Sequence, residues 1–430
     1  ESGEIIMRAK LLGAVAALSI AWASPAAADT VCEWMDFANR IAAAGGGAAP
    51  ASAVTAAPRN PELSRAQTRV ALAMFEALNA IDRRYDSYLD LPLGDATASQ
   101  DAAAITAAYQ VLLHFYPAQR AALEENYAVA MEAVSDAARR EAGRVIGEAA
   151  ARAAITAGGI DPTVPQTPYR PRTAAGQWTA TALPVIEPYS IAFGPWVLAR
   201  ADSVRPAPPP ALDSERWARD YEEVRRLGAR ESNARTPHQT LMARYRITPD
   251  MMPTLRQTAD APGRSLVQNA RLFALVNMAG DDAGMATSEA KLHYNFWRPL
   301  HAIRNAAEDG NPATQPDPAW EPLIGTPNHP EYPCAHCSGA AVIAEVMKAE
   351  TGPRPASGVR VSSRSIPTAA IQVMPSWDDW VSEVSLSRTL GGVHYRFSNE
   401  AGEEIGRRVG RMAVERVMRP LPAGQQRRAR

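Results

Sequence analysis

Two cations seven residues apart, Lys291 and Arg298, are the first candidates for chemistry in this chain of 430 residues. Only three of its 45 lysines and arginines are lysines, so a lysine seven residues before an arginine indicates a need for a compact ammonium beside a guanidinium. On one helix the two side chains would lie two turns apart on the same face, roughly 10 Å along the axis. They could therefore converge on one oxyanion.

Two further clusters place histidines beside cations or helix starts. The proline-rich segment 327–339 runs into a predicted helix, where free backbone N–H groups attract an anion and His336 can transfer a proton. In the segment 387–397, Arg388 can clamp oxygens and His394 can attack or ligate a central atom. Three cations, one helix start and two imidazoles suit a phosphoryl or vanadate group.

Each cluster also has a structural interpretation. A lysine and an arginine on a helix are most often a solvated face, and a histidine at a helix end is most often a hydrogen-bond partner. Cys334 and Cys337 are compatible with a disulfide, which would reshape the loop before Ser338, or with a redox pair, although no βαβ pattern surrounds them. The joint occurrence of all three clusters favours the functional interpretation.

Helices must position these clusters, because apolar residues recur at spacings of three and four and sheet signals are nearly absent. We predict an all-α fold, a helical bundle in one domain over residues 29–424. A long proline-rich connection at 158–212 should pack on that domain, and the tail 425–430 should be frayed. Helices are predicted over residues 64–85, 118–154, 214–230, 265–305 with an interruption near Arg298, 338–350, 378–390 and 400–418.

The first 28 residues have the pattern of a signal peptide, with an extension of residues 1–6 before a charged start, an apolar stretch and Ala26-Ala27-Ala28. The predicted mature chain has no apolar run long enough for a transmembrane segment, so we expect a periplasmic or secreted protein. A net charge of −1 argues against nucleic acid as a partner. Three cysteines allow at most one intrachain disulfide.

These clusters resemble the three motifs of the vanadium-dependent haloperoxidase and type 2 phosphatidic acid phosphatase superfamily, K-x6-RP, PSGH and SR-x5-H. Lys291 and Arg298 match the first motif, and Arg388 and His394 match the third. The wording GGVHYRF is similar to the haloperoxidase branch, and the helix around Asp282 resembles that of exported bacterial members. The resemblance implies a helical bundle of the haloperoxidase or acid phosphatase type.

The middle motif departs from the family pattern. His336 is present, but Cys334 stands in place of the serine that binds the oxyanion, and Ala335 in place of the glycine whose N–H approaches it. Ser398 stands where many relatives carry an aspartate that orients the histidine. His329 lies where bromide-oxidising relatives carry histidine, which is a secondary indication.

The resemblance implies vanadate as the cofactor, with phosphate as a competing oxyanion, and peroxide and halide as substrates. His394 would ligate vanadium and His336 would act as acid and base. The oxyanion would be bound by Lys291, Arg298, Arg388, the N–H of Ala335 and position Cys334. Two alternatives stay open: a soluble acid phosphatase that hydrolyses a phosphate monoester through a phosphohistidine, and an inactive oxyanion-binding or structural relative. The oligomeric state is not predicted.

Overall fold

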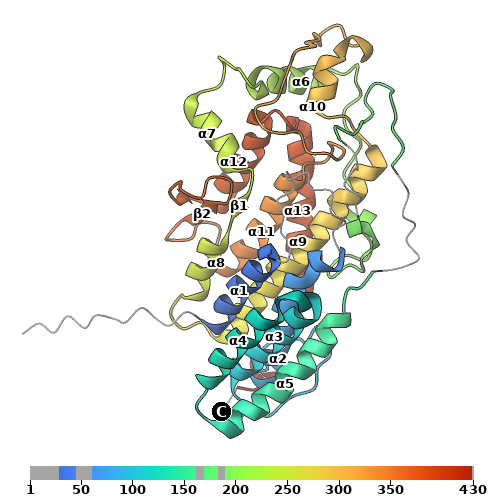
Figure 1. Cartoon of the computed structure of the whole chain (residues 1–430). Helices are drawn as coiled ribbons and strands as arrows, with labels where there is room; N and C mark the ends of the chain where they lie inside the picture. Colours follow the sequence, from blue (N-terminus) through green and yellow to red (C-terminus); the bar gives the residue numbers. More distant parts are fainter. Residues whose placement is uncertain (1–28, 45–60, 161–168, 183–188, 429–430) are drawn as a thin grey trace, which may run out of the picture.

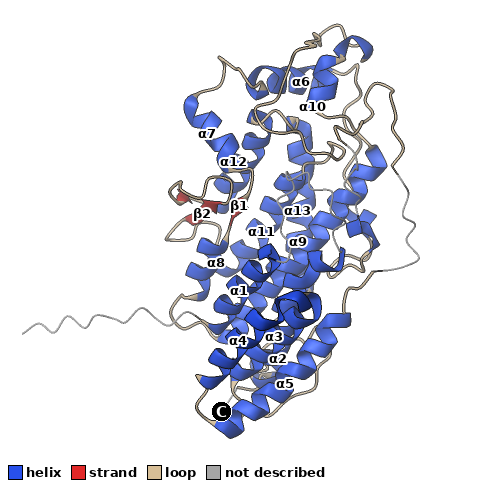
Figure 2. Cartoon of the chain, viewed as in Figure 1, coloured by secondary structure: helices blue, strands red, loops and turns tan. Residues whose placement is uncertain are grey.

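The computed structural model describes residues 29–44, 61–160, 169–182 and 189–428. In these ranges the molecule is elongated and mostly helical, with one small sheet (Figures 1 and 2). The α-helices described there are α1 (Thr30–Ala44), α2 (Ala66–Ile81), α3 (Gln100–Phe115), α4 (Arg120–Glu132), α5 (Ala137–Thr156), α6 (Glu215–Gly228), α7 (Pro237–Tyr245), α8 (Met252–Ala259), α9 (Leu266–Tyr294), α10 (Pro299–Arg304), α11 (Ala335–Thr351), α12 (Trp377–Leu390) and α13 (Arg396–Arg416). The predicted all-α helical class is therefore confirmed.

Helix α9 links the two ends of the molecule (Figure 1). Its 29 residues span about 44 Å at 1.5 Å per residue. At one end α2 packs on α3, α5 and α9, and at the other α11 and α13 pack on each other and on α9. One hydrophobic cluster contains Leu72 of α2, Phe273 of α9 and Val342 of α11, so both ends share a continuous core.

Two glycines of α13 allow its backbone to contact the start of α11. A Cβ built on Gly402 of α13 would lie 2.3 Å from the carbonyl oxygen of Cys334, and one on Gly406 would lie 2.2 Å from that of Ser338. Both distances are too short for any side chain. The backbone of α13 therefore lies directly on the first turns of α11.

The small sheet was not predicted. Its strands are β1 (Pro249–Asp250), β2 (Val359–Ser363) and β3 (Gln372–Met374), in the order β1-β2-β3 with antiparallel pairing. Val359 and Val361 point inward on β2. Strands of two to five residues are too short to show a convincing alternation in sequence.

The helix predictions need several corrections. The segment 118–154 is two helices, because the chain turns after α4 and Asp136 caps α5 by accepting the N–H of Arg139. Helix α11 begins at Ala335 and α13 at Arg396, each a few residues earlier than predicted. Helices α1, α3, α7 and α8 were not predicted.

The described parts of the proline-rich connection pack on the domain, as predicted. Trp178 is 3% exposed, and its backbone N–H donates to the carbonyl of Asn295 at 2.8 Å. The predicted fraying of the tail is wrong at Arg427, since its backbone N–H donates to Arg83 and its guanidinium to the carbonyl of Gly94, both at 2.9 Å.

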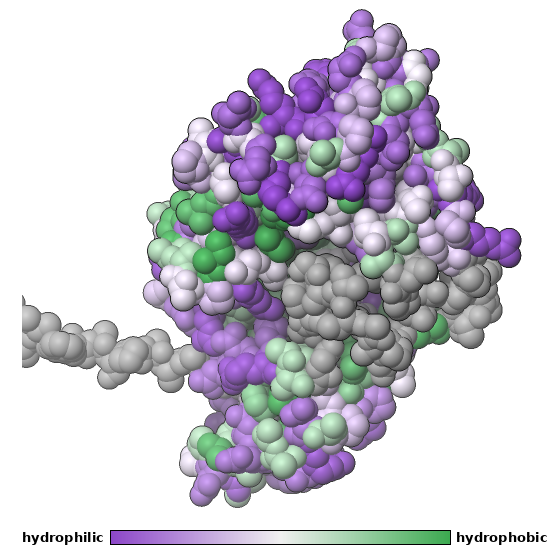
Figure 3. Space-filling view, turned by 45° about the horizontal axis from the view of Figure 1, so that its top comes forward, coloured by the Kyte–Doolittle hydropathy of each residue, from purple (hydrophilic) through white to green (hydrophobic). Residues whose placement is uncertain are grey.

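The predicted signal peptide, residues 1–28, lies outside the described residues. Within the described part of the chain, no helix combines the length and apolar character needed to cross a membrane. The described residues on the face seen in Figure 3 are mostly hydrophilic, with one group of strongly apolar residues and other apolar residues scattered over it.

Candidate active site

The first motif is divided by a turn. Helix α9 ends at Asn295, which has a left-handed conformation with φ of 46°, and Pro299 starts α10 where no backbone donor is required. The prediction that Lys291 and Arg298 project from one helix face is therefore wrong, because the chain changes direction between them. Both side chains are nevertheless buried and both reach the loop before α11.

Arg298 joins the loop before α11 to the segment after α12. Its Nε donates to the carbonyl of His329 at 3.0 Å, and its Nη1 donates to the carbonyl of Val393 at 2.8 Å. Nη1 also lies 3.1 Å from Nε2 of His394, and Nη2 lies 3.0 Å from Nδ1 of His329. Burial first, and then the Arg298 charge, hold the pKa of both imidazoles well below the usual value. Both histidines are therefore neutral around pH 7.

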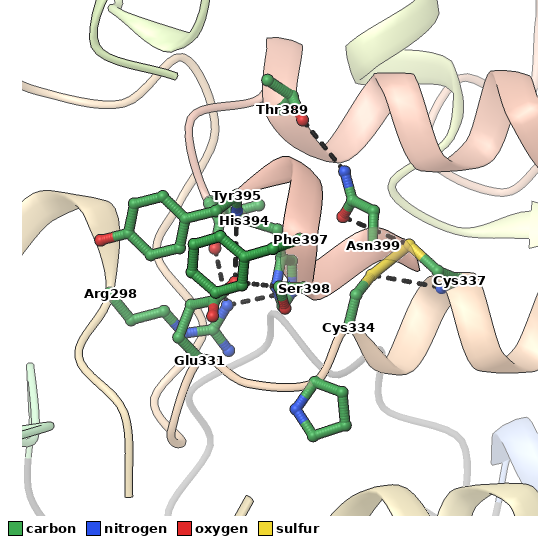
Figure 4. Close-up of polar contacts among 12 residues, drawn as sticks. Arg298, Glu331, Cys334, Cys337, Thr389, His394, Tyr395, Phe397, Ser398 and Asn399 are labelled. Carbon is green, nitrogen blue, oxygen red and sulfur yellow. Dashed lines mark hydrogen bonds and ion pairs between the residues drawn. A yellow bond between two sulfur atoms is a disulfide. The ribbon is translucent and has the colours of Figure 1, made fainter. Parts of the chain in front are cut away.

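Glu331 is a site residue that the sequence analysis missed. Its side chain is fully buried, and Oε1 accepts the N–H of His394 Nδ1 at 2.7 Å and the backbone N–H of Tyr395 at 3.3 Å (Figure 4). This contact places the imidazole hydrogen on Nδ1, so the lone pair of Nε2 faces Arg298. A carboxylate thus orients His394, although Ser398 replaces the expected aspartate.

Burial raises the pKa of Glu331 to about 7, opposed by the charges of Arg298 and Lys291. Ser398 lies beside the same pair, with Oγ 3.4 Å from Nδ1 of His394. The carboxyl group therefore lies between cations and an imidazole, where it can change its protonation state near neutral pH.

Lys291 holds the loop before α11 in this structure. Its ammonium donates to the carbonyls of Pro330 at 3.0 Å, Glu331 at 2.7 Å and Pro333 at 2.5 Å. All three donors of the ammonium are used by the backbone. Burial and the neighbouring arginines lower its pKa well below the usual value. Its predicted role as a direct oxyanion ligand stays a prediction.

Arg388, in the last turn of α12, is 2% exposed. Within the described residues, its Nε and Nη1 are buried without a hydrogen-bond partner. Its charge adds to the lowering of the pKa of His336 after burial, and of the pKa of His394 after burial and the charges of Arg298 and Lys291. A buried guanidinium with open donors is the strongest sign of an anion-binding position here.

His336 lies in the first turn of α11, one residue after Ala335. Its Nε2 lies 2.9 Å from the carbonyl of Ile247, so Nε2 carries the hydrogen and Nδ1 is the free acceptor. Burial, followed by the Arg388 charge, lowers the pKa of His336 to about 3. Ala335 is exposed and is the first residue of the helix, where backbone N–H groups have no partner inside the helix.

Cys334 and Cys337 are joined by a disulfide in the first turn of α11. Sγ of Cys334 caps the helix by accepting the N–H of Cys337 at 3.2 Å, and the helix starts directly afterwards. The expectation that a bridge would reshape the loop before Ser338 stays a prediction. With its sulfur bonded, Cys334 has no hydrogen to donate, so the predicted oxyanion role of its side chain does not hold in this state.

Asp282 is not part of this cluster. Its carboxylate accepts the backbone N–H groups of Trp196, Val197 and Leu198 at 2.7–3.1 Å, which anchors the proline-rich connection to α9. It lies nine residues before Lys291 on the same helix, about 13 Å along the axis. Its function in this structure is to hold the connection in place.

The remaining residues bring together buried groups that can bind an anion. Arg298 and Arg388 supply charge, Nε2 of His394 supplies a lone pair, and the N-terminus of α11 supplies backbone donors. This donor set suits a tetrahedral oxyanion, with N–H donors for its oxygens and a nitrogen lone pair for its central atom.

The fold is a helical bundle of the vanadium haloperoxidase type. Residues 271–422 match the family described as the VCPO second helical-bundle domain, which covers the first motif, the middle motif and the third motif. The resemblance stated from the motifs is thereby confirmed.

Particular relatives support the same class. The chain is 30% identical over 181 residues to vanadium chloroperoxidase of Curvularia inaequalis, a match covering 32% of this chain and 29% of that protein, less than a third of its length. The structure of the first bacterial vanadium-dependent iodoperoxidase superposes with a TM-score of 0.73 at 19% identity, covering 93% of this chain and 99% of that one. A holo-type bacterial vanadium-dependent chloroperoxidase gives 0.65 at 16% identity over 86% and 94% of the two chains. These structures share the fold of this chain.

Proposed function

We propose that this protein is a vanadate-dependent haloperoxidase that oxidises halide with hydrogen peroxide. The observation that carries the proposal is Arg388, a buried guanidinium whose Nε and Nη1 have no partner within the described residues and whose charge acts on the neutral imidazoles of His336 and His394. An oxyanion would satisfy those donors. The family match over residues 271–422 indicates vanadate as that oxyanion.

Each residue has a specific task in this proposal. His394 would ligate vanadium through Nε2, because Glu331 holds the hydrogen on Nδ1. Arg388 and the N–H of Ala335 would donate to the oxygens, and Arg298 would add positive charge beside them. When bound, vanadate would supply the Lewis acid that activates peroxide towards halide.

Proton transfer falls to His336. Its Nε2 donates to Ile247, which leaves Nδ1 as an acceptor, and its low pKa keeps it neutral at pH 7. A neutral imidazole can take a proton from incoming peroxide, as a general base does. A bound anion would offset the Arg388 charge and raise the pKa of His336 towards the working pH.

The test uses protein stripped of phosphate and incubated with orthovanadate. Peroxide-dependent bromination should appear in the vanadate-loaded protein and be absent both without vanadate and in an Arg388→Met variant. Hydrolysis of an aryl phosphate without bromination would overturn the proposal in favour of a phosphatase. Absence of both activities, with no metal retained after gel filtration, would overturn it as well.

A further inference from the structure

We propose that Cys334 and Cys337 form a peroxide-reactive dithiol and disulfide couple in the first turn of α11. Both sulfurs belong to a Cys-Ala-His-Cys run at the start of a helix of 17 residues. The couple needs only peroxide and its own two thiols, so it is separate from the proposed halide oxidation. The couple would be a second, metal-free reaction of peroxide beside the proposed anion site.

The disulfide contributes little to holding the fold together. It closes a loop with only two residues between the cysteines, so the chain entropy that it removes from the unfolded state is small compared with that of a bridge over a long loop. The neighbouring helices are already held by the close contact between Gly402 of α13 and the backbone of Cys334. A structural role therefore does not account for the pair.

The position of Cys334 favours its thiolate. Sγ lies at the N-cap of α11 and accepts the N–H of Cys337, so the helix end and a hydrogen bond both stabilise negative charge there. The cations Arg388, Arg298 and Lys291 act on His336 in the same turn, which makes this end of the helix electropositive. A thiolate stabilised in this way is a nucleophile for peroxide.

The surroundings also suit the reduced state. Asn399 donates from its amide nitrogen to the carbonyl of Ser385 at 2.9 Å and to Thr389 Oγ1 at 3.0 Å, which fixes the direction of the amide (Figure 4). Its Oδ1 then faces Sγ of Cys337 at 3.4 Å. An acceptor at that place has a partner only when Cys337 carries a hydrogen, that is, as a thiol. The site therefore provides for both redox states.

Peroxide can approach the sulfurs through the first turn. Cys334 and Cys337 are themselves fully buried, but Ala335 between them is exposed and His336 is half-buried. The sulfurs thus lie one residue below the surface of the helix start. Peroxide is close to water in size, so a small local opening is enough.

The reaction balances without another reagent. The Cys334 thiolate attacks one peroxide oxygen, the oxygen–oxygen bond breaks, and hydroxide leaves and takes up the proton lost from Cys334 to become water. The Cys337 sulfur then attacks the sulfenic sulfur, and the displaced hydroxide takes the Cys337 proton to give a second water. Two thiols and one hydrogen peroxide become one disulfide and two waters.

The experiment uses full-length protein reduced with dithiothreitol, desalted, and kept free of vanadate and halide. One equivalent of hydrogen peroxide should lower the thiol count under denaturing conditions from three to one, leaving Cys32. The rate should be roughly tenfold above that of a Cys334→Ser variant, because the attacking thiolate is lost. A Cys337→Ser variant should stop at a sulfenic acid on Cys334, trapped with dimedone, and Cys32→Ala should react like the wild type.

Retention of three thiols would overturn the proposal, and so would loss of thiols at the same rate in Cys334→Ser. Peptide mapping of the oxidised wild type gives a second measure that does not depend on the folding of any variant: absence of a 334–337 disulfide would also overturn it. Because vanadate is excluded, these outcomes are independent of the bromination test. Thiol loss without bromination would leave the couple in place and remove the haloperoxidase.

Discussion

Replacing Arg388 by methionine should stabilise the anion-free protein, although the residue is buried. Each buried donor without a partner costs about 1–3 kcal/mol, and Arg388 has two such donors among the described residues. The substitution also removes the repulsion between Arg388 and Arg298, which contributes to lowering the pKa of Arg388. Imperfect filling of the guanidinium volume opposes this by about 1–2 kcal/mol. The free energy of unfolding should therefore rise, by up to about 5 kcal/mol, in phosphate-free buffer.

Urea unfolding with and without inorganic phosphate measures the stability of the anion-free protein and the stabilisation that a bound anion adds. Phosphate at about 100 times its Kd should stabilise the wild type by about 2.7 kcal/mol and leave Arg388→Met almost unchanged. Arg246 is a control of similar burial. Its Nη1 also has no partner among the described residues, but its Nε donates to Glu383 Oε1 at 2.8 Å and its Nη2 donates to Gln372. Arg246→Met strands a carboxylate, so it should destabilise by about 3–5 kcal/mol and keep the phosphate response.

One result would refute the reasoning. If Arg388→Met were less stable than the wild type in phosphate-free buffer and still gained stability from phosphate, Arg388 would be a paired structural residue. The anion would then bind elsewhere, and the observation that carries the proposed function would be lost.

Three further predictions concern the same region. Glu331→Gln should lower kcat of the vanadate-loaded protein by roughly 10–100-fold with a smaller change in KM, because His394 loses the charge that fixes its tautomer; an unchanged kcat would contradict this. Because the pKa of His336 falls to about 3 on folding, protonation favours the unfolded state below pH 6.5, and its contribution to stability should drop by about 2 kcal/mol at pH 5. Glu331 has the opposite effect on stability as the pH falls, because its pKa rises to about 7 on folding. The contribution of His336 is therefore measured as the difference in the pH dependence of stability between the wild type and His336→Gln. Equal slopes for the two proteins would disprove the prediction. Gly402→Ala should lower the stability by about 1–3 kcal/mol or more through its clash with the α11 backbone, whereas Gly284→Ala, where a Cβ meets nothing within 4 Å, should not; thermal unfolding compares them.

Much of the site was predictable because its motifs have fixed spacing at the ends of helices. Arg298 comes from one segment, and Arg388 and His394 come together from a second one, 387–397. The structure places Nη1 of Arg298 3.1 Å from Nε2 of His394, and the charges of Arg298 and Arg388 act on each other and on that imidazole. Charged and imidazole groups that are far apart in sequence meet there because each follows or ends a helix that packs on α9 or α11. The chemistry of the residue types was sufficient to suggest an anion.

Glu331 could not be assigned in the same way. Its partner, His394, is 63 residues away, and the contact depends on how the loop before α11 packs against the segment after α12. The only signal was a carboxylate inside the apolar run Pro330-Glu331-Tyr332-Pro333, a place where a charge must be paired if it is buried. Helix α3 was missed for a different reason, because its alanine-rich sequence is buried on nearly all sides and shows no amphipathic stripe.

In this protein Lys291 of the first motif positions the loop before α11. Its ammonium fixes the carbonyls of Pro330, Glu331 and Pro333, and through that backbone it fixes the carboxylate of Glu331. The carboxylate in turn sets the tautomer of His394 and so presents Nε2 to the anion position. A lysine needed only for its charge would tolerate replacement by arginine, but three carbonyls around one point suit a compact ammonium and not a planar fork. Lys291→Arg should therefore impair the site by displacing Glu331, and an Arg variant that keeps wild-type vanadate affinity would contradict this view of the loop.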